Sequence, residues 1–476
     1  MLVPAFMHCV DSCGWHDASG SGPRGVRRST IERRRWSMSR LARGYANDRA
    51  SGPAGLGSAP NAVHVFCTEL ELSEPPRDVE LPPDATAVRV LVRVHRIPLG
   101  FITLAPEAFA QREVVLASAF QEFGDRIRDH FGGAGAVPET GDGLLVAGRR
   151  SCERPMPHNH VTVVVATRNR PSHLRECLQT LLSLDYGNFD VIVVDNDPDT
   201  DDTERVFELV VGIDERFRYI RLDQAGLSRA RNAGLAAARG PLVAFVDDDV
   251  RVDPFWLQAL ARAFNEQPAV VCVTGLVAAQ SIVGAEQLYF DSRVSWATDL
   301  EPRVYHPTSD DPLHPWAAGR FGAGANMAFR LAAVRALGGF DEDLGAGTKA
   351  RGGEDIDMFV RALRSGGDLM YEPAALVWHV HRSRRADLER QLFGYGVGLT
   401  AYLLKQALHR QVALEMARKL PRATRHILAV TKVSQTNGVE ARSARRYRLI
   451  ELTGMVLGPV YYLHSRVAGR VRRSVR

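Results

Sequence analysis

Apolar runs and helical spacings succeed one another along residues 161–250. Mainly apolar runs of four to six residues suit strands of a sheet, and Leu242–Val246 is continuously apolar, as a strand buried on both faces should be. Between them, apolar residues recur at the spacing of helices that bury one face. The predicted strands are Val161–Ala166, Val191–Val194, Tyr219–Leu222 and Leu242–Val246, and the predicted helices are Ser172–Leu184, Thr203–Val211 and Leu227–Arg239. This alternation predicts an α/β fold with a mostly parallel sheet and helices on both faces.

The pattern changes on either side of this segment and divides the chain into four parts. Residues 1–60 are rich in Arg, Gly and Ser and are expected to be disordered. Residues 61–155 predict a small α/β unit without a chemical motif, so a structural or partner-docking role is expected. Residues 156–382 form the main α/β domain, and residues 383–476 predict basic amphipathic helices.

Specific elements are predicted in the two flanking units. In the N-terminal unit, strands are expected at Val63–Thr68 and Ala87–Val94, and a helix at Pro106–Phe131. In the C-terminal region, Leu388–Leu408 and Ser443–Val471 place apolar residues among arginines at helical spacing.

Charge is unevenly distributed along the chain. Arg and Lys outnumber Asp and Glu by 9 to 4 in residues 1–60 and by 20 to 5 in residues 382–476. Because these ends carry +5 and +15 while the whole chain carries +5, the residues between them carry −15. An acidic centre suits a metal-dependent site. The basic tail suits either packing on the main domain or an anionic membrane surface, and both roles stay open.

The sequence has no recognisable targeting or membrane-spanning segment. Asp11, His16 and Asp17 interrupt the first apolar residues, and no apolar stretch reaches the ~20 residues that span a bilayer. The six cysteines are scattered without a CxxC pair, so neither a disulfide framework nor structural zinc is expected. We expect a cytoplasmic protein with no nucleic-acid partner. Of the two roles open to the basic tail, docking on a membrane would place the protein at the inner face of that membrane.

Three adjacent carboxylates, Asp247, Asp248 and Asp249, follow the apolar run Leu242–Val246. Open α/β sheets bind ligands beyond the C-terminal ends of their strands. Adjacent negative charges repel unless a cation lies among them, and Mg²⁺ or Mn²⁺ prefers oxygen ligands and binds diphosphates. The alternative is a polar turn before the helix that starts at Asp253-Pro254.

Further motifs surround the triplet in a characteristic order. They are Ala166-Thr167-Arg168-Asn169-Arg170-Pro171, Val194-Asp195-Asn196, Gly226-Leu227-Ser228-Arg229-Ala230-Arg231-Asn232, Gly339-Phe340-Asp341-Glu342 and Gly353-Glu354-Asp355. With these motifs the chain resembles the family 2 glycosyltransferases over roughly residues 160–382. The resemblance implies a GT-A fold, which is a Rossmann-like mixed sheet with helices on both faces.

The resemblance also assigns residues to a nucleotide-sugar donor. Thr167 and Arg168 match the family's first-strand contacts, and Asp195 matches a carboxylate that accepts an N–H from the nucleobase. Arg231 matches a contact to the base or to a phosphate, because a guanidinium offers fixed donors and a permanent charge. Arg229 is the alternative for that role.

The triplet matches the family's DxD signature, which holds a divalent cation. Asp247 and Asp248 match positions that face the nucleoside, and Asp249 matches the ligand of Mn²⁺ or Mg²⁺, with Asp247 as a further ligand. His379 matches a histidine that some members use as a third ligand, and His381 is the alternative. The cation would stabilise the charge that the leaving diphosphate gains.

Glu354 and Asp355 match the family's ED motif at the start of a predicted helix. The resemblance makes Asp355 the general base that takes the proton of the acceptor hydroxyl, with Glu354 as the runner-up and Asp357 as a residue that holds either in place. The segment Gly322–Met327 would form backbone near the donor sugar and acceptor. The competing interpretation is acidic charge that complements the helix dipole.

The resemblance therefore predicts inverting, metal-dependent transfer of a sugar from a nucleotide-diphosphate sugar to an acceptor hydroxyl. A catalytically silent sugar-nucleotide-binding protein and a membrane-surface adaptor are the alternatives. The motifs leave the sugar and the acceptor open, and the acceptor classes include a lipid-linked saccharide, a polysaccharide and a small metabolite.

Overall fold

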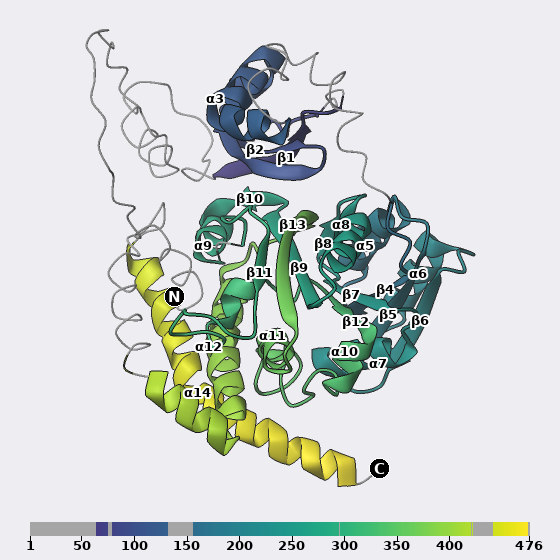
Figure 1. The fold of residues 1–476 in the computed structure, drawn as a ribbon, viewed down its shortest axis with the longest axis vertical. Helices are drawn as coiled ribbons and strands as arrows, with labels where there is room; N and C mark the ends of the chain where they lie inside the picture. Colours follow the sequence, from purple (N-terminus) through teal and green to yellow (C-terminus); the bar gives the residue numbers. More distant parts are fainter. Residues whose placement is uncertain are drawn as a thin grey trace, which may run out of the picture.

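The computed structural model describes residues 63–74, 79–131, 156–294, 296–419, 421 and 441–474. The disorder expected for residues 1–60 lies outside these ranges. The described chain contains a small N-terminal sheet, a large central sheet and a pair of long C-terminal helices, seen in Figure 1 from top to bottom.

The N-terminal unit is a curved sheet covered by a helix. Its elements are β1 (His64–Glu71), β2 (Ala87–Val94), β3 (Ile97–Leu104), α2 (Pro106–Phe109) and α3 (Arg112–His130). The bounds of β2 are those predicted, but the single helix expected at Pro106–Phe131 is divided in two at Ala110 and Gln111.

The N-terminal sheet takes its fourth strand from the main domain. Strand β10 (Ser281–Val283) pairs antiparallel with β1, so the strand order is β10-β1-β2-β3. The backbone hydrogen bonds of this pairing attach the small unit to the rest of the chain. A buried ion pair between Arg93 Nη1 and Asp253 Oδ2, 2.6 Å apart, adds a second attachment.

The central sheet of the main domain is mixed. It runs in the order β11-β13-β9-β12-β7-β4-β5-β6, and β8 also pairs with β13. Its strands are β4 (Val161–Thr167), β5 (Phe189–Asn196), β6 (Phe217–Leu222), β7 (Leu242–Asp247), β8 (Val250–Val252), β9 (Val270–Ala279), β11 (Arg303–Tyr305), β12 (Asn326–Arg330) and β13 (Asp368–His379).

The parallel part of this sheet is the one predicted from the apolar runs. Strand β4 pairs parallel with both β5 and β7, and β5 pairs parallel with β6. Strand β12 is antiparallel to both of its neighbours, β7 and β9. The α/β fold with a mixed sheet is confirmed, while the expectation of a mostly parallel sheet missed the antiparallel insertion.

Helices cover both faces of the central sheet. They are α5 (Pro171–Leu182), α6 (Asp202–Val211), α7 (Leu227–Ala237), α8 (Trp256–Glu266), α9 (Gly284–Val294), α10 (Leu331–Ala336) and α11 (Glu354–Arg364). Apolar side chains of α5 and α8 pack on one face, and those of α7, α10 and α11 pack on the other. The short η2 turn, Ala318–Phe321, lies beside α11.

Two long helices pack side by side at the C-terminal end of the chain (Figure 1). Helix α12 (Arg385–Ala407) contacts α14 (Ala441–Ser474) along their length. The backbones approach so closely that a Cβ on Gly396 would lie 2.1 Å from the carbonyl oxygen of Glu451. A Cβ on Gly398, on the same helix, would lie 2.7 Å from the backbone of Gly352, which directly precedes the Gly353-Glu354-Asp355 motif.

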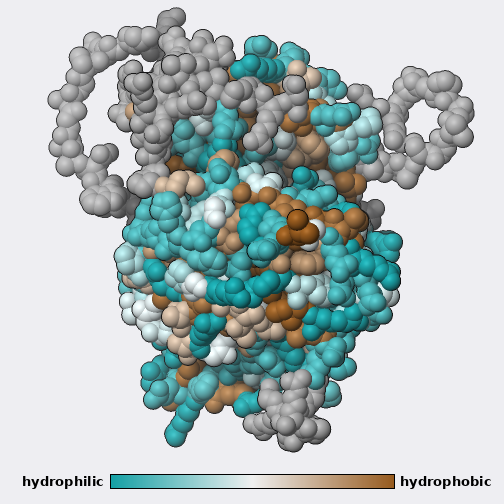
Figure 2. All heavy atoms as spheres, turned by 90° about the vertical axis from the view of Figure 1, so that its right-hand side faces the viewer, coloured by the Kyte–Doolittle hydropathy of each residue, from teal (hydrophilic) through white to brown (hydrophobic). Residues whose placement is uncertain are grey.

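The surface at the β6 edge of the sheet is largely hydrophilic, with some hydrophobic side chains gathered among the hydrophilic ones (Figure 2). Leu209 and Ile213 are among the exposed apolar residues of the described chain. Among the residues that the structure describes, none of the helices combines the length and the apolar character needed to cross a bilayer.

Candidate donor and acceptor site

A cavity of about 590 Å³ opens where β4, β5 and β7 end. Its wall contains residues of the predicted motifs and also residues of helix α12, which carries none of those motifs. Residues that line it are Thr167, Arg168, Asn196, Arg231, Asp247, Asp248, Asp249, Glu354, Asp355, His379, Tyr395 and Leu399. Because parallel strands end at the same edge of a sheet, residues far apart in sequence meet here.

The carboxylates of the triplet contact different partners. Asp248 accepts hydrogen bonds from Thr167 Oγ1 at 2.8 Å and from Arg170 Nη1 at 3.0 Å. The same Arg170 nitrogen donates to Asp249 Oδ2 at 3.0 Å. Asp247, the third carboxylate, accepts from Arg231 Nη2 at 3.0 Å. Two guanidinium groups therefore offset the repulsion within the triplet.

Burial and mutual repulsion separate the pKa values of the triplet. Burial raises the pKa of Asp248 to about 7, and the charge of Asp249 adds to the rise. Burial tends to raise the pKa of Asp249, but the surrounding basic side chains, among them Arg170 and Arg382, outweigh burial and lower the pKa. Asp249 is therefore the member of the pair that holds its negative charge most firmly.

Asp249 and His379 face each other across the end of the triplet. Asp249 Oδ1 is buried without a hydrogen bond from the described residues, and His379 Nε2 lies 3.5 Å from it. Burial lowers the pKa of His379 to about 4, so its imidazole is neutral at pH 7. The runner-up, His381, lies behind His379, with their Nδ1 atoms 3.1 Å apart.

Arg231 joins the triplet to the predicted base motif. Its side chain is buried, Nη1 donates to Glu354 Oε1 at 3.0 Å, and Nη2 donates to Asp247 and to the carbonyl oxygen of Gly324. Arg229 is directed elsewhere and pairs with Glu342 at 3.1 Å. Arg231 is thus the member of the pair that lies in the cavity.

Glu354 and Asp355 start helix α11 directly after Gly353. Gly353 has a φ of 84°, and a Cβ there would lie 2.5 Å from the carbonyl oxygen of Gly398, so the turn requires glycine. Asp355 Oδ2 accepts the backbone N–H of Gly324 at 3.0 Å, which aims the carboxylate. Burial raises the pKa of Glu354 to about 7, Asp355 adds to the rise, and Arg231 opposes it.

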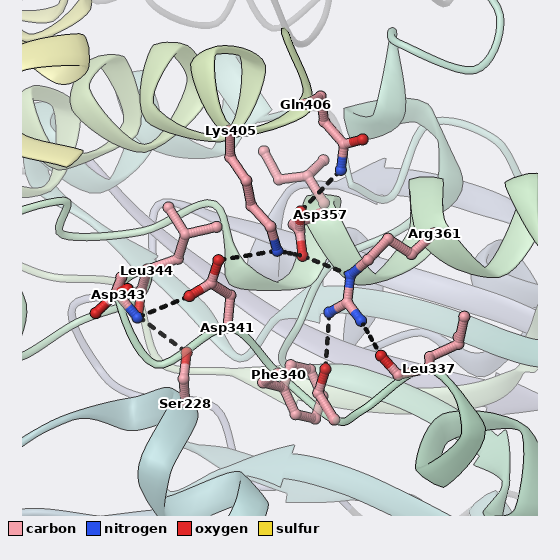
Figure 3. Close-up of polar contacts among 12 residues, drawn as sticks. Ser228, Leu337, Phe340, Asp341, Asp343, Leu344, Asp357, Arg361, Lys405 and Gln406 are labelled. Atoms are coloured by element: carbon pink, nitrogen blue, oxygen red, sulfur yellow. Dashed lines mark hydrogen bonds and ion pairs between the residues drawn. The ribbon is translucent and has the colours of Figure 1, made fainter. Parts of the chain in front are cut away.

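Asp357 points toward Lys405 and Gln406 of helix α12 (Figure 3). Its carboxylate accepts from Arg361 at 2.8 Å, Lys405 at 2.7 Å and Gln406 at 2.8 Å. Lys405 also pairs with Asp341 at 2.9 Å, so one ammonium joins the Gly339–Glu342 motif to α11. In the structure Asp357 therefore anchors α12 and does not contact Glu354 or Asp355 through these bonds.

Two of the residues predicted to bind the donor, Asp195 and Arg168, have their charged groups paired with other protein side chains. Asp195 is fully buried behind the cavity wall, where its Oδ2 accepts from Tyr219 Oη at 2.5 Å, and burial raises its pKa. The next residue, Asn196, lines the cavity instead. Arg168 lines the cavity but pairs with Asp197 at 2.7 Å on the surface.

Arg170 was not among the predicted site residues. It stands within the quoted Ala166–Pro171 motif, and a basic residue close to a buried triplet of carboxylates is the signal that identifies it. Helix α12 carried no such signal, because Tyr395 and Leu399 have side chains typical of any buried helix face.

A mixed α/β sheet with a carboxylate-rich cavity at its strand ends defines a class of ligand-binding α/β proteins, and sequence comparison specifies the family. The family described as "Glycosyl transferase family 2" matches residues 162–335. The chain is 30% identical over 235 residues to the succinoglycan biosynthesis protein ExoM of Rhizobium meliloti, covering 48% of this chain and 69% of ExoM. The chain belongs to glycosyl transferase family 2.

Other relatives match over shorter shares of their length. A pre-mycofactocin glycosyltransferase of Mycobacterium tuberculosis is 32% identical over 245 residues, covering 50% of this chain and 46% of the relative. The chain thus spans about half the length of that relative. A mannosyltransferase from Pyrobaculum calidifontis, solved with GDP-Man and Mn²⁺, superposes with a TM-score of 0.40 at 17% identity, covering 66% of this chain and 90% of that one.

Proposed function

We propose that this protein transfers a sugar from a nucleotide-diphosphate sugar to an acceptor hydroxyl. The observation that carries the proposal is the arrangement around Arg231, whose guanidinium contacts both Asp247 of the donor motif and Glu354 of the base motif in one cavity. A donor and an acceptor bound in that cavity would meet between the two motifs.

We propose Thr167, Arg168, Asp247 and Asp248 as donor-binding residues. Asp195 is proposed as the nucleobase contact from the family resemblance, although its neighbour Asn196, and not Asp195, lines the cavity. Arg231 has its nitrogens committed to carboxylates, so its part in donor binding would be to hold Asp247 in place.

The residues at the end of the triplet fit a divalent cation. Asp249 brings a buried carboxylate oxygen that accepts no hydrogen bond from the described residues, and His379 brings a neutral imidazole nitrogen. Asp247 is the further candidate ligand. Within the described residues, no three or more His, Cys, Asp or Glu side chains converge as a ready metal cluster. Mg²⁺ and Mn²⁺ commonly bind with few protein ligands and take others from phosphates. When bound, the cation supplies charge stabilisation to the diphosphate.

Asp355 is the proposed general base, and Glu354 is the runner-up. Asp355 takes the proton of the acceptor hydroxyl as the oxygen forms a bond to the anomeric carbon, and the bond to the diphosphate breaks with its electron pair. A single displacement of this kind inverts the anomeric configuration. Glu354 is less suited, because its carboxylate is committed to a buried ion pair with Arg231.

A donor screen with the full chain tests this function. UDP-, GDP- and dTDP-sugars are added with and without Mn²⁺, the melting temperature is measured, and the release of nucleoside diphosphate is followed for each donor that stabilises. One class of donor should raise the melting temperature and be consumed. Stabilisation without consumption in the presence of hydroxyl acceptors would favour the silent sugar-nucleotide-binding alternative, and no stabilisation by any donor would contradict the proposal.

We also propose that the outer face of α14 contacts an anionic membrane surface. Six apolar residues on this helix are between 47% and 76% exposed: Leu449, Leu452, Val456, Val460, Leu463 and Val467. From Leu449 to Val467 they cover 18 positions in five intervals, so the mean interval equals the 3.6-residue repeat of the α-helix. The stripe therefore runs straight along the helix, as a flat surface requires, and does not drift as in a coiled coil.

The charges of α14 favour an anionic lipid as the partner of this stripe. The helix contains eight arginines, and its one acidic residue, Glu451, is buried in an ion pair with Arg293. Arg442, Arg445 and Arg446 are exposed at the end of the stripe. Apolar burial with basic flanks is the composition of interfacial helices, and each arginine near an anionic surface adds about 1 kcal/mol.

A further inference from the structure

We infer that Arg89, Asp291 and His381 are positioning residues that fix the orientation and the proton arrangement of His379. This inference rests on the proposed function, because it concerns His379 as a ligand of the divalent cation. It assigns the N-terminal unit a part in the site, since Arg89 lies on β2.

The four side chains form a continuous series of polar contacts. His379 Nδ1 lies 3.1 Å from His381 Nδ1, and His381 Nε2 lies 3.4 Å from Asp291 Oδ1. The other carboxylate oxygen, Asp291 Oδ2, accepts from Arg89 Nη1 at 2.9 Å. His379 ends strand β13, His381 lies two residues further on, Asp291 lies on helix α9 and Arg89 lies on strand β2.

All members of the series are shielded from water. The side chains of His379 and His381 are 8% and 2% exposed, and those of Asp291 and Arg89 are each 13% exposed. Rings pack against both imidazoles, with Trp296 edge-on to His379 and Phe290 edge-on to His381. Neither imidazole can readily exchange its protein partner for water, so each partner decides where the neighbouring proton lies.

The proton positions follow from the requirements of a metal ligand. If His379 presents the lone pair of Nε2 toward the cation beside Asp249, its Nδ1 must carry the proton. Nδ1 then donates to His381 Nδ1, which leaves the proton of His381 on Nε2. His381 Nε2 in turn donates to Asp291, which is an acceptor because its carboxylate is ionised. Each ring nitrogen in the series has one role that is consistent with both neighbours.

Asp291 and Arg89 form the end of the series that lies farthest from His379. Burial disfavours the charge of Asp291, but the hydrogen bond from His381 and the charge of Arg89 outweigh it and lower the pKa of the carboxyl group. Arg89 is itself fixed, because its guanidinium lies 4.3 Å from the centre of the Phe101 ring. A carboxylate that orients a metal-bound histidine is a frequent arrangement, and its loss typically weakens metal binding by ~10–100-fold.

Binding of Mn²⁺ alone to the full chain tests this inference. Free Mn²⁺ is measured by electron paramagnetic resonance for the wild type and for His381→Phe, Asp291→Asn and Arg89→Met. His381→Phe keeps a ring against Phe290 but removes both nitrogens. His381→Asn is the rescue variant, because its amide oxygen can accept from His379 Nδ1. Melting temperatures are measured in parallel.

Glu301→Gln is the matched control. Glu301 pairs with Arg126 of α3, so this ion pair also joins the N-terminal unit to the main domain, but it is exposed and does not contact the histidines. The variant tests whether any loss of charge between the two units weakens the cation site.

We expect His381→Phe to bind Mn²⁺ at least ~10-fold more weakly than the wild type. Asp291→Asn and Arg89→Met should lose less Mn²⁺ affinity. His381→Asn should recover part of the affinity that His381→Phe loses, and Glu301→Gln should bind Mn²⁺ as the wild type does. In turnover assays, the Mn²⁺ concentration for half-maximal rate should rise while the rate at saturating Mn²⁺ changes little. Wild-type Mn²⁺ affinity in all three variants would overturn the inference, and equal losses in Glu301→Gln would reduce the contacts to a structural role. If the wild type binds no Mn²⁺, this inference fails, while donor stabilisation measured without metal still reports on the proposed function.

Discussion

Arg231 and Glu354 face each other with 3.0 Å between Nη1 and Oε1, although 123 positions separate them in the chain. Both side chains are almost fully buried, at 3% and 7% exposure. The second terminal nitrogen of the same guanidinium holds Asp247. Helix α11 and strand β7, which carry the two carboxylate motifs, are therefore linked by one side chain.

Arg231→Met should destabilise the protein, because it leaves Glu354 buried without its ion-pair partner. Loss of one member of a buried pair typically costs ~3–5 kcal/mol, and denaturant unfolding of the variant measures it. Glu354→Gln in the Arg231→Met background should recover part of the loss, since it removes the unpaired charge. An unfolding midpoint equal to that of the wild type would contradict the assigned role of Arg231.

Asp355→Asn should abolish most transfer while leaving donor binding intact. The amide keeps an acceptor for the N–H of Gly324 but cannot take a proton, so the rate should fall by ~10²–10⁴-fold, the usual contribution of a positioned base. NMR of the wild-type product should show an inverted anomer. Near-normal turnover of the variant, or a retained anomer, would refute the mechanism without affecting the donor site.

Asp249→Ala should remove the Mn²⁺-dependent part of donor affinity, because it deletes the carboxylate whose buried oxygen has no hydrogen-bond partner in the part of the chain that the structure describes. Calorimetric titration with the donor identified in the screen, with and without Mn²⁺, measures this part directly. Glu215→Ala removes an exposed carboxylate away from the cavity and serves as the control. Equal donor affinity of Asp249→Ala and the wild type in Mn²⁺ would rule out the metal-site assignment.

Lys405→Met should lower stability at neutral pH and much less in acid. Burial tends to raise the pKa of Asp341, but Lys405 and neighbouring donors outweigh it and lower the pKa below its usual value. A lowered pKa contributes stability above the unfolded value of about 3.9 that is lost as the pH falls through the folded value. The difference in unfolding free energy between wild type and variant should therefore shrink below about pH 4. A difference that stays constant down to pH 3 would show that the Lys405–Asp341 pair contributes nothing.

Val456→Asp combined with Val460→Asp should prevent binding to vesicles. The two substitutions place carboxylates in the middle of the exposed stripe of α14, where they oppose both apolar burial and attraction to anionic lipid. Sedimentation with phosphatidylglycerol vesicles should detect the wild type at low salt, release it at ~1 M salt by screening, and fail to detect the variant. Phosphatidylcholine vesicles are the uncharged control. If the wild type ignores anionic vesicles, the stripe has another partner.

The sequence predicted the parts of the fold that depend on local pattern. Strands β4, β5 and β7 appear as mainly apolar runs because most of their side chains are buried, and the ends of β4 and β7 carry Thr167 and Asp247. The family resemblance assigned Thr167 to the same site as the triplet, and the parallel pairing of β4 with β7 brings both to one edge of the sheet. The predicted strand Ala87–Val94 agrees with β2, most of whose residues are also buried.

The sequence did not predict the parts that depend on distant partners. Strand β12 has only five residues and begins with the buried polar Asn326, whose amide donates to the carbonyl oxygens of Leu276 and Ala375. Strand β10 has three residues and forms by pairing with β1 across more than 200 positions. The predicted placement of Asp195 at the site depended on its strand-end position alone, which does not reveal that Tyr219 holds its side chain inside the wall.

The contacts of Gly396 and Gly398 decide how this protein should be shortened for structural work. The family match ends at residue 335, and the recognisable motifs end near His379, so a fragment that stops at residue 382 looks complete by sequence. Such a fragment would lack Tyr395 and Leu399 from the cavity wall, and it would leave the backbone that precedes Glu354 without the helix that packs on it. A truncation at residue 382 would therefore remove part of the cavity wall, so expression should extend through α14.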